Sequence, residues 1–127
     1  MIILHYEFLY QLTAIMRGVG LHHRLRVLLG VTGAVLAHVV EIWVFGCAYY
    51  FMNRADGWGQ LEGNFDGSLL DCIYFSFTTF TTLGYGDIVA IGNIRFLAGL
   101  ESLTGLVLIT WTASFFFLEM QRYWDQS

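Results

Sequence analysis

Two long apolar segments constrain this chain more than any other feature of its sequence. Residues 27–52 read VLLGVTGAVLAHVVEIWVFGCAYYFM, and residues 94–118 read IRFLAGLESLTGLVLITWTASFFFL. A helix rises about 1.5 Å per residue, so roughly 20 apolar residues cross the hydrocarbon core of a bilayer. Both segments exceed that length. The sequence therefore predicts an all-α membrane protein with two transmembrane helices.

The composition agrees with a membrane location and excludes several functions. Hydrophobic residues make up 57% of the chain and charged residues 13%, whereas soluble domains average about 25% charged residues. The net charge is −4 in a mostly uncharged chain, with three of its acids in one loop, so we expect no nucleic-acid partner. The sequence shows no nucleophile–base arrangement, metal-ligand cluster or phosphate-binding loop. We therefore expect neither an enzyme nor a protein with a small-molecule substrate.

Between the apolar segments lie a polar stretch and a short apolar one. Residues 53–67, NRADGWGQLEGNFDG, are rich in glycine and acids, which predicts an outer loop. Residues 68–80, SLLDCIYFSFTTF, number only 13, which is too short to span and favours a re-entrant helix. Ser68 and Asp71 suit its first turn, because a hydroxyl can cap free N–H groups and a carboxylate is favoured by the helix dipole.

Residues 1–26 precede the first span and are predicted to form an interfacial helix followed by a basic cytoplasmic segment. Apolar residues recur there at roughly helical spacing: Ile2, Tyr6, Leu9, Tyr10 and Ile15. That pattern suits a helix lying at the membrane interface, and equally one that packs against the rest of the protein. Gly18 and Gly20 should end this helix.

The basic residues predict the orientation in the membrane. Arg17, Arg24 and Arg26 precede the first span, and Arg122 follows the second, just before the short tail 123–127. Basic residues favour the cytoplasmic side. We therefore expect a multi-pass protein of the cell membrane (plasma or inner), with both termini cytoplasmic and the acidic loop outside.

The short apolar stretch runs directly into residues 81–87, TTLGYGD. In this setting the sequence resembles the pore region of potassium channels, whose filter commonly reads Thr-Val-Gly-Tyr-Gly followed by Asp. The resemblance covers residues 27–122. It implies a homotetramer around one pore, with residues 68–80 as the pore helix and K⁺ ions held by protein oxygens. The ion-binding groups would be the backbone carbonyls of Thr82, Leu83, Gly84 and Tyr85, together with the Thr82 hydroxyl.

The residue types of this motif fit that role. Gly84 and Gly86 lack a Cβ and can adopt backbone conformations forbidden to other residues, which lets successive carbonyls point the same way. Asp87 completes the motif. Leu83 replaces the usual valine, and its carbonyl can still serve.

Further residues are assigned to support the filter. By analogy with the family, Tyr74 is the candidate hydrogen-bond donor to Asp87 or Tyr85. Thr78 stands where some bacterial channels have a glutamate that braces the filter. Glu101, in the second span, is expected to brace the filter from behind.

Other polar or small residues in the spans have two interpretations each. Gly105 is either a gating hinge or a site of close helix packing. Phe115 and Phe116 either narrow the inner end of the pore or face lipid. His38 and Glu41 lie three apart on one helix face, where they form either a structural hydrogen-bonding pair or a pH-sensitive element. Cys47 and Cys72 are expected to be free, with a bridge as the alternative.

These observations favour one function over two others. The preferred function is a potassium channel that conducts passively, whose partners are copies of itself and membrane lipids. The alternatives are a weakly selective monovalent cation channel and an accessory membrane subunit that does not conduct.

Overall fold

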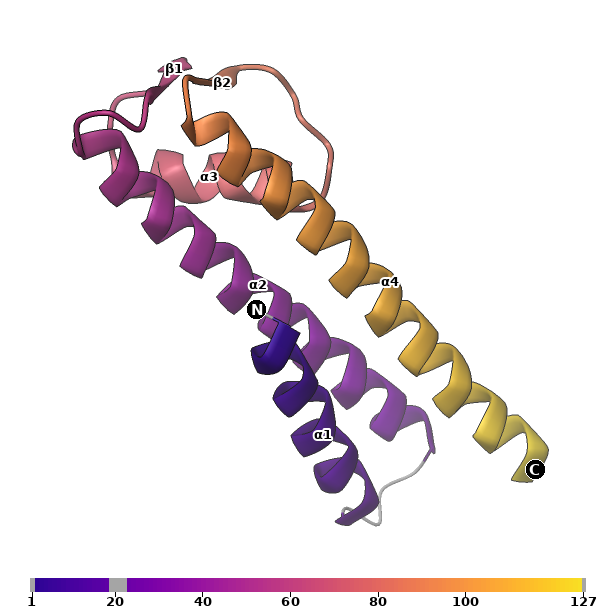
Figure 1. Ribbon diagram of the computed structural model, residues 1–127. Helices are drawn as coiled ribbons and strands as arrows, with labels where there is room; N and C mark the ends of the chain where they lie inside the picture. The colour runs from indigo at the N-terminus through magenta and orange to yellow at the C-terminus, as the bar shows by residue number, and fades with distance from the viewer. Residues whose placement is uncertain (1, 19–22, 127) are drawn as a thin grey trace. The chain divides into compact units, whose positions relative to one another are not determined.

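The computed structural model describes residues 2–18 and 23–126, and the side chains of residues 2–15 and 25–121. Four helices and two short strands follow one another along the described chain (Figure 1). In order they are α1 (Ile2–Gly18), α2 (His23–Arg54), β1 (Gln60–Gly63), α3 (Leu69–Phe80), β2 (Ile88–Ile91) and α4 (Ile94–Gln126). Gly20 and the side chains of Arg17, Arg24 and Arg122, on which the orientation and the helix break were predicted, lie outside this description.

The prediction of a mainly helical protein with two long apolar helices is confirmed. Leu25–Arg54, 30 residues, and Ile94–Gln121, 28 residues, are long and apolar enough to cross a membrane. Both helices run past the predicted bounds of 27–52 and 94–118. The flanking residues explain this: arginine, glutamate, methionine and glutamine are good helix formers, and neither proline nor glycine interrupts them.

The chain divides into two compact units, whose boundaries fall inside α2 and α4. The first unit comprises residues 1–39 and 108–127, and the second comprises residues 40–107. The second unit contains all of α3, which lies between the last part of α2 and the first part of α4 (Figure 1). Its apolar core is formed by the buried side chains of Tyr49, Leu61, Cys72, Phe75, Ile88 and Ile94.

The expectation of an all-α chain with an irregular loop over residues 53–67 is wrong in one respect. β1 and β2 pair antiparallel, with Gln60 opposite Ile91 and Gly63 opposite Ile88. Each strand has only four residues, too few to show an alternating pattern in a glycine-rich stretch. Leu61, on β1, is buried in the core.

Three side chains around the start of α3 accept hydrogen bonds from backbone N–H groups. Ser68 is the N-cap and accepts a hydrogen bond from the Asp71 backbone N–H at 3.2 Å. Asp66 accepts from the Ser68 N–H at 2.9 Å, and Asp71 accepts from the Asp66 N–H at 3.0 Å. The hydrogen bonds from Ser68 lower the pKa of Asp66. The helix therefore begins where its capping residues predicted.

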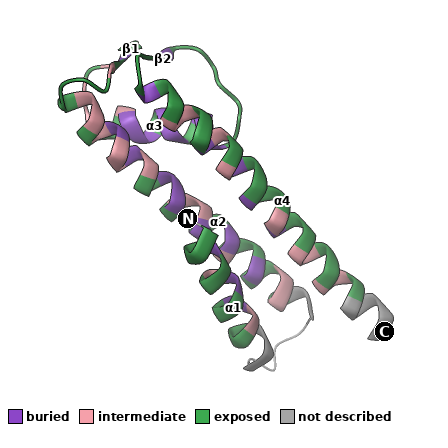
Figure 2. Cartoon of the chain, viewed as in Figure 1, coloured by how far each residue is buried: buried purple, intermediate pink, exposed green. Residues whose placement is uncertain are grey.

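Burial differs sharply between the helices of the second unit (Figure 2). Most of α3 is buried, including Cys72, Ile73, Phe75, Ser76, Thr78, Thr79 and Phe80. The first part of α4 instead exposes large apolar side chains: Phe96, Leu100, Leu103, Leu106 and Val107. Such a surface is stable only when lipid or another protein covers it.

In the first unit, α1 packs through a stripe of buried residues. His5, Leu9 and Leu12 are buried and recur at helical spacing. A Cβ on Gly33 of α2 would lie 3.2 Å from a terminal carbon of Leu12, so the two helices approach closely there. The other apolar residues of the expected interfacial face, namely Ile2, Tyr6, Tyr10 and Ile15, are exposed. α1 thus has one face that packs and another available to a membrane interface.

Candidate functional site

Residues 81–87 link the end of α3 to the start of β2 and are anchored at both ends. At the helix end, the Gly84 N–H donates to the Thr78 carbonyl at 3.1 Å. At the other end, the Asn64 N–H donates to the Asp87 carbonyl at 2.8 Å. Gly63 permits this second anchor, because its φ is +107° and a Cβ there would lie only 2.2 Å from the Asp87 oxygen. Thr82 adds a third contact, because its N–H donates to the Thr79 carbonyl at 3.1 Å.

The backbone of this segment alternates in the sign of φ. Thr82, Gly84 and Gly86 have φ values of 61°, 53° and 85°. Leu83 and Tyr85, between them, are not among the residues with positive φ. Alternating backbone handedness collects successive N–H groups on one side of a chain and successive carbonyls on the other. The segment can therefore present a row of neutral oxygens.

Thr82 is the unexpected member of this alternation. It is the non-glycine residue with positive φ in the described part of the chain. A β-branched residue is a genuine outlier there, and such strain persists only where the surrounding structure enforces it. Sequence reasoning assigned the unusual backbone conformations to the glycines and missed Thr82. Neither the residue type of Thr82 nor its spacing signals a positive φ.

The side chains of the segment are largely uncovered in the single chain. Leu83 is 63% exposed and Tyr85 is 68% exposed. Leucine and tyrosine lose favourable burial free energy in such positions. Their exposure indicates a surface that another molecule covers.

A groove of about 460 Å³ borders the segment. Its lining comes from α3, the segment, β2 and α4: Phe75, Thr78, Thr79, Thr82, Gly84, Gly86, Ile88, Val89, Ala90, Ala98, Gly99 and Ser102. Each of these side chains is uncharged. Within the described chain, the polar character of the groove comes from hydroxyl and backbone groups.

Tyr74 and Asp87 are brought together beside the segment. A hydrogen bond to Asp87 raises the pKa of Tyr74, with partial burial and the Asp87 charge acting in the same direction. Asp87 also accepts from the Ile88 N–H at 3.1 Å. Thr78 is buried; its hydroxyl donates to the Phe75 carbonyl at 3.0 Å, while its own carbonyl holds Gly84.

Glu101 lies at the centre of a buried hydrogen-bond network that joins α2, α3 and α4. The Tyr49 hydroxyl donates to Glu101 Oε1 at 2.8 Å, and Ser76 contacts Glu101 Oε2. The Ser76 hydroxyl also reaches the Ile42 carbonyl at 2.8 Å. Glu101 thus braces the middle of α3, the helix that leads directly into residues 81–87. The sequence indicated Glu101, but not Tyr49 or Ser76, because spacing cannot pair residues across helices.

Gly105 lies against the end of α3. A Cβ at this position would come within 2.0 Å of the Phe80 carbonyl oxygen, closer than any real side chain can approach. Of its two interpretations, close packing therefore has a direct structural basis. The contact places α4 next to Phe80, the last residue of α3 before residues 81–87.

Two predicted pairs lie elsewhere in the chain. The rings of Phe115 and Phe116 meet edge-to-face at 5.3 Å between centroids, while Phe117 is 57% exposed. Cys47 and Cys72 are both free. Burial raises the pKa of the Cys72 thiol to about 11, so this side chain is an unreactive thiol at neutral pH.

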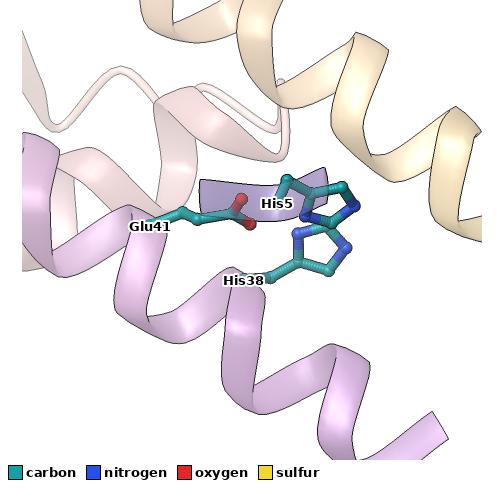
Figure 3. A group of neighbouring side chains, drawn as sticks. All are labelled: His5, His38 and Glu41. Atoms are coloured by element: carbon teal, nitrogen blue, oxygen red, sulfur yellow. The ribbon is translucent and has the colours of Figure 1, made fainter. Parts of the chain in front are cut away.

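His38 contacts residues that the sequence did not connect with it. Its Nε2 lies 3.2 Å from the Thr112 hydroxyl, and its ring stacks on that of His5 with centroids 5.2 Å apart. Figure 3 shows the side chains of His5 and His38, whose rings form this stack. The sequence did not indicate the contact between His5 and His38, because the two residues are distant in sequence and their pairing depends on how α1 packs.

Comparison with known proteins assigns most of the chain to one family. A family model described as ion channel matches residues 27–122, about three quarters of the chain. The match includes α3, the segment 81–87 and most of α2 and α4, whereas α1 precedes it. A search of curated proteins finds no match.

Proposed function

Because this chain belongs to the ion channel family, we propose that it forms a potassium-selective channel with residues 82–86 as its filter. Four copies surround one pore, and K⁺ passes down its electrochemical gradient between their backbone oxygens. The mechanism is the one known for potassium channels, in which carbonyls replace the hydration shell of the ion. The ion-binding groups are the carbonyls of Thr82, Leu83, Gly84 and Tyr85 and the Thr82 hydroxyl.

The alternation of φ along residues 82–86 is the observation that carries this proposal. An ordinary turn between two helices has no need of positive φ at every second residue. A row of carbonyls has such a need, and the strained conformation of Thr82 is of the kind that concentrates at functional sites. Neutral oxygens suit a monovalent cation that must bind and then leave.

The helix that precedes the filter supports cation binding. Residues 69–80 run directly into Thr81, so the C-terminal end of α3 lies beside the filter. That end carries partial negative charge, which stabilises a nearby cation. The acids of the outer loop act at longer range: Asp56, Glu62, Asp66 and Asp87 are exposed and raise the local cation concentration, an effect that salt weakens.

A fourfold assembly accounts for the uncovered surface of one chain. A single strand of oxygens cannot surround an ion, and non-helical backbone at membrane depth must be enclosed by protein or line water. Neighbouring copies supply both the other oxygens and cover for Leu83 and Tyr85. The termini are cytoplasmic and the acidic loop lies outside.

Ion flux into liposomes tests this proposal. The purified protein should pass K⁺, exclude Na⁺ in bi-ionic reversal-potential measurements, and be blocked by Ba²⁺. Gly86→Ala should abolish selective flux, because alanine resists a φ of 85°. Gly57→Ala is the matched control: its φ is 92°, it has open space around it, and it lies in the outer loop, so flux should persist.

Three results would contradict the proposal in different ways. Equal permeability to Na⁺ and K⁺ would indicate a weakly selective cation channel. Absence of flux from well-folded protein would indicate an accessory subunit. Selective flux that survives Gly86→Ala would show that the filter lies elsewhere.

A further inference from the structure

We propose that Glu101 is a proton-binding site: its carboxyl group carries a hydrogen on Oε2 and, through that hydrogen, positions α3 on α2. Glu101 and the groups that it contacts all lie in the second compact unit. The site is separate from the oxygens assigned to K⁺, so Glu101 acts here as a positioning residue. Its protonation does not depend on the proposed function, whereas the effect on K⁺ flux does.

A chain of oxygen–oxygen contacts runs through the side chain of Glu101 and joins three helices. The Tyr49 hydroxyl lies 2.8 Å from Glu101 Oε1, and Ser76 Oγ lies 2.5 Å from Glu101 Oε2. The same Ser76 oxygen lies 2.8 Å from the Ile42 carbonyl oxygen. Each separation lies in the range of an O–H···O hydrogen bond. The three side chains have no exposed surface, so the groups themselves supply the hydrogens.

These three contacts need three hydrogens, one for each. Tyr49 has one hydroxyl hydrogen and Ser76 has another, whereas a carboxylate and a backbone carbonyl only accept. If Glu101 were ionised, two hydrogens would serve three contacts. Ser76 could then donate to Glu101 or to Ile42, and the other oxygen would face its lone pairs. A protonated carboxyl group supplies the third hydrogen.

One arrangement of the three hydrogens makes all three bonds. Tyr49 donates to Glu101 Oε1, Glu101 donates from Oε2 to Ser76 Oγ, and Ser76 donates to the Ile42 carbonyl. The second bond joins α4 to α3, and the third joins α3 to α2. Loss of the proton turns the Ser76 hydroxyl to the carboxylate and breaks its bond to Ile42. The proton on α4 therefore holds α3, the helix that leads into residues 81–87, against α2.

The surroundings of Glu101 also favour a neutral carboxyl group. Among the described residues, the side chains that contact this group are Tyr49 on α2 and Ser76 on α3, and neither is basic. Tyr49 is the titratable one, and a tyrosine ordinarily keeps its proton up to about pH 10. A buried carboxylate without a cation is so unfavourable that the group takes up a proton instead. The charge argument and the hydrogen count therefore agree.

Infrared difference spectroscopy of the purified protein tests the protonation. At about pH 6 an exposed glutamate is ionised, so the wild type should show a carboxylic acid C=O band that Glu101→Gln lacks. The glutamine amide can make the same three hydrogen bonds, so this variant should fold. Glu62→Gln is the matched control, because Glu62 is exposed on β1. It should remove a carboxylate band and keep the acid band.

Unfolding equilibria in detergent count the same proton independently. Unfolding exposes Glu101, which then ionises and releases its proton. The ratio of the wild-type unfolding constant to that of Glu101→Gln should therefore rise about tenfold per pH unit above about pH 5. The rise ends where the folded protein also loses the proton. Glu62→Gln should keep the wild-type pH dependence. Absence of the acid-band difference, or a ratio that does not change with pH, would overturn the proposal.

The effect on conduction rests on the proposed function and is measured separately. Over the pH range in which the acid band of the wild type disappears, K⁺ flux into liposomes should fall, because α3 loses its bond to α2. The flux of Glu101→Gln should stay constant over that range. Equal profiles in the two proteins would contradict the link between this proton and the pore. The band and the unfolding ratio need no conduction, so a protein that conducts at no pH would contradict the proposed function alone.

Discussion

Thr82 concentrates the strain of the candidate filter at one residue. Its neighbours Gly84 and Gly86 adopt positive φ without a steric penalty, whereas a β-branched residue at φ 61° is strained by roughly 1–3 kcal/mol. The branched side chain that makes threonine unfavourable there also carries the hydroxyl that we propose as an ion ligand. Stability and function should therefore respond in opposite directions at this position.

Thr82→Gly tests that opposition. It should leave the protein as stable as the wild type or raise its stability by about 1 kcal/mol, because strain is relieved, and it should reduce K⁺ selectivity. Thr81→Gly is the control, since Thr81 has an ordinary φ of −83°; it should lower stability by about 0.5–1 kcal/mol. Thermal unfolding and reversal potentials measure the two effects. A clear loss of stability in Thr82→Gly would refute the assigned strain.

The Tyr74–Asp87 hydrogen bond should make the filter sensitive to alkaline pH. The bond raises the pKa of Tyr74 above its ordinary value of 10.0. Its contribution to stability is thus fully present below pH 10 and is lost as pH rises through the higher pKa of the folded state. K⁺ flux should fall across that alkaline range in the wild type. Tyr74→Phe should lack this step, whereas Tyr10→Phe, on α1, should retain it; identical alkaline profiles in all three proteins would argue against the role of Tyr74.

At the scale of helices, α3 is held between α2 and α4 by contacts that tolerate little change. Gly105 meets the Phe80 backbone, and Glu101 joins Tyr49 to Ser76. Both contacts lie on the face of α4 that packs on α3. They therefore position the helix end from which the filter departs.

Two glycines of α4 provide a matched comparison. Gly105→Ala should destabilise the protein by about 1–3 kcal/mol, because the new methyl group cannot fit against the Phe80 carbonyl. A Cβ on Gly99 would meet no other atom of the described chain within 4 Å, so Gly99→Ala should raise stability by up to about 1 kcal/mol. Denaturation in detergent measures both. Equal effects would show that packing does not require Gly105.

Two substitutions at Glu101 test whether the buried network needs a carboxyl group or only a hydrogen-bonding side chain. Glu101→Ala should cost about 1–3 kcal/mol for each buried partner left unsatisfied. Glu101→Gln should cost much less, since its oxygen can accept from Tyr49 and its NH₂ can donate to Ser76. Unfolding free energies provide the measurement. A Gln variant as unstable as the Ala variant would show that the negative charge itself is required.

The helices could be predicted from the sequence because their signals are local. Length and apolarity predicted the two long helices, and Ser68 with Asp71 predicted the start of α3. β1 and β2 are too short to show a pattern, and their pairing depends on Gly63 approaching the Asp87 carbonyl. His5 likewise needed the packing of α1 to reveal its partners. Contacts between distant segments are therefore what the sequence could not predict.

At the scale of the whole molecule, the side chains of Leu83 and Tyr85 are largely exposed in one chain, and the proposed fourfold assembly would cover them. Cross-linking and native mass spectrometry of the purified protein should give a species four times the 14.5 kDa of one chain. Leu83→Asp should weaken this assembly, because it puts a charge on a side chain that is 63% exposed in the single chain and that the proposed tetramer would cover. The effect of Leu83→Asp on assembly is compared with that of Leu70→Asp, which puts the same charge on a side chain of α3 that is 72% exposed. A monomer that conducts would contradict the fourfold arrangement.

The alternating backbone of residues 82–86 has a further consequence for such an assembly. Most peptide strands twist, because every residue bends the chain with the same handedness. A strand that reverses its handedness at each step accumulates no net twist and runs straight. Four straight strands can remain parallel to a common axis, so their oxygens form evenly spaced layers. An ion would then move between nearly equivalent positions in single file, with no deep trap along the way.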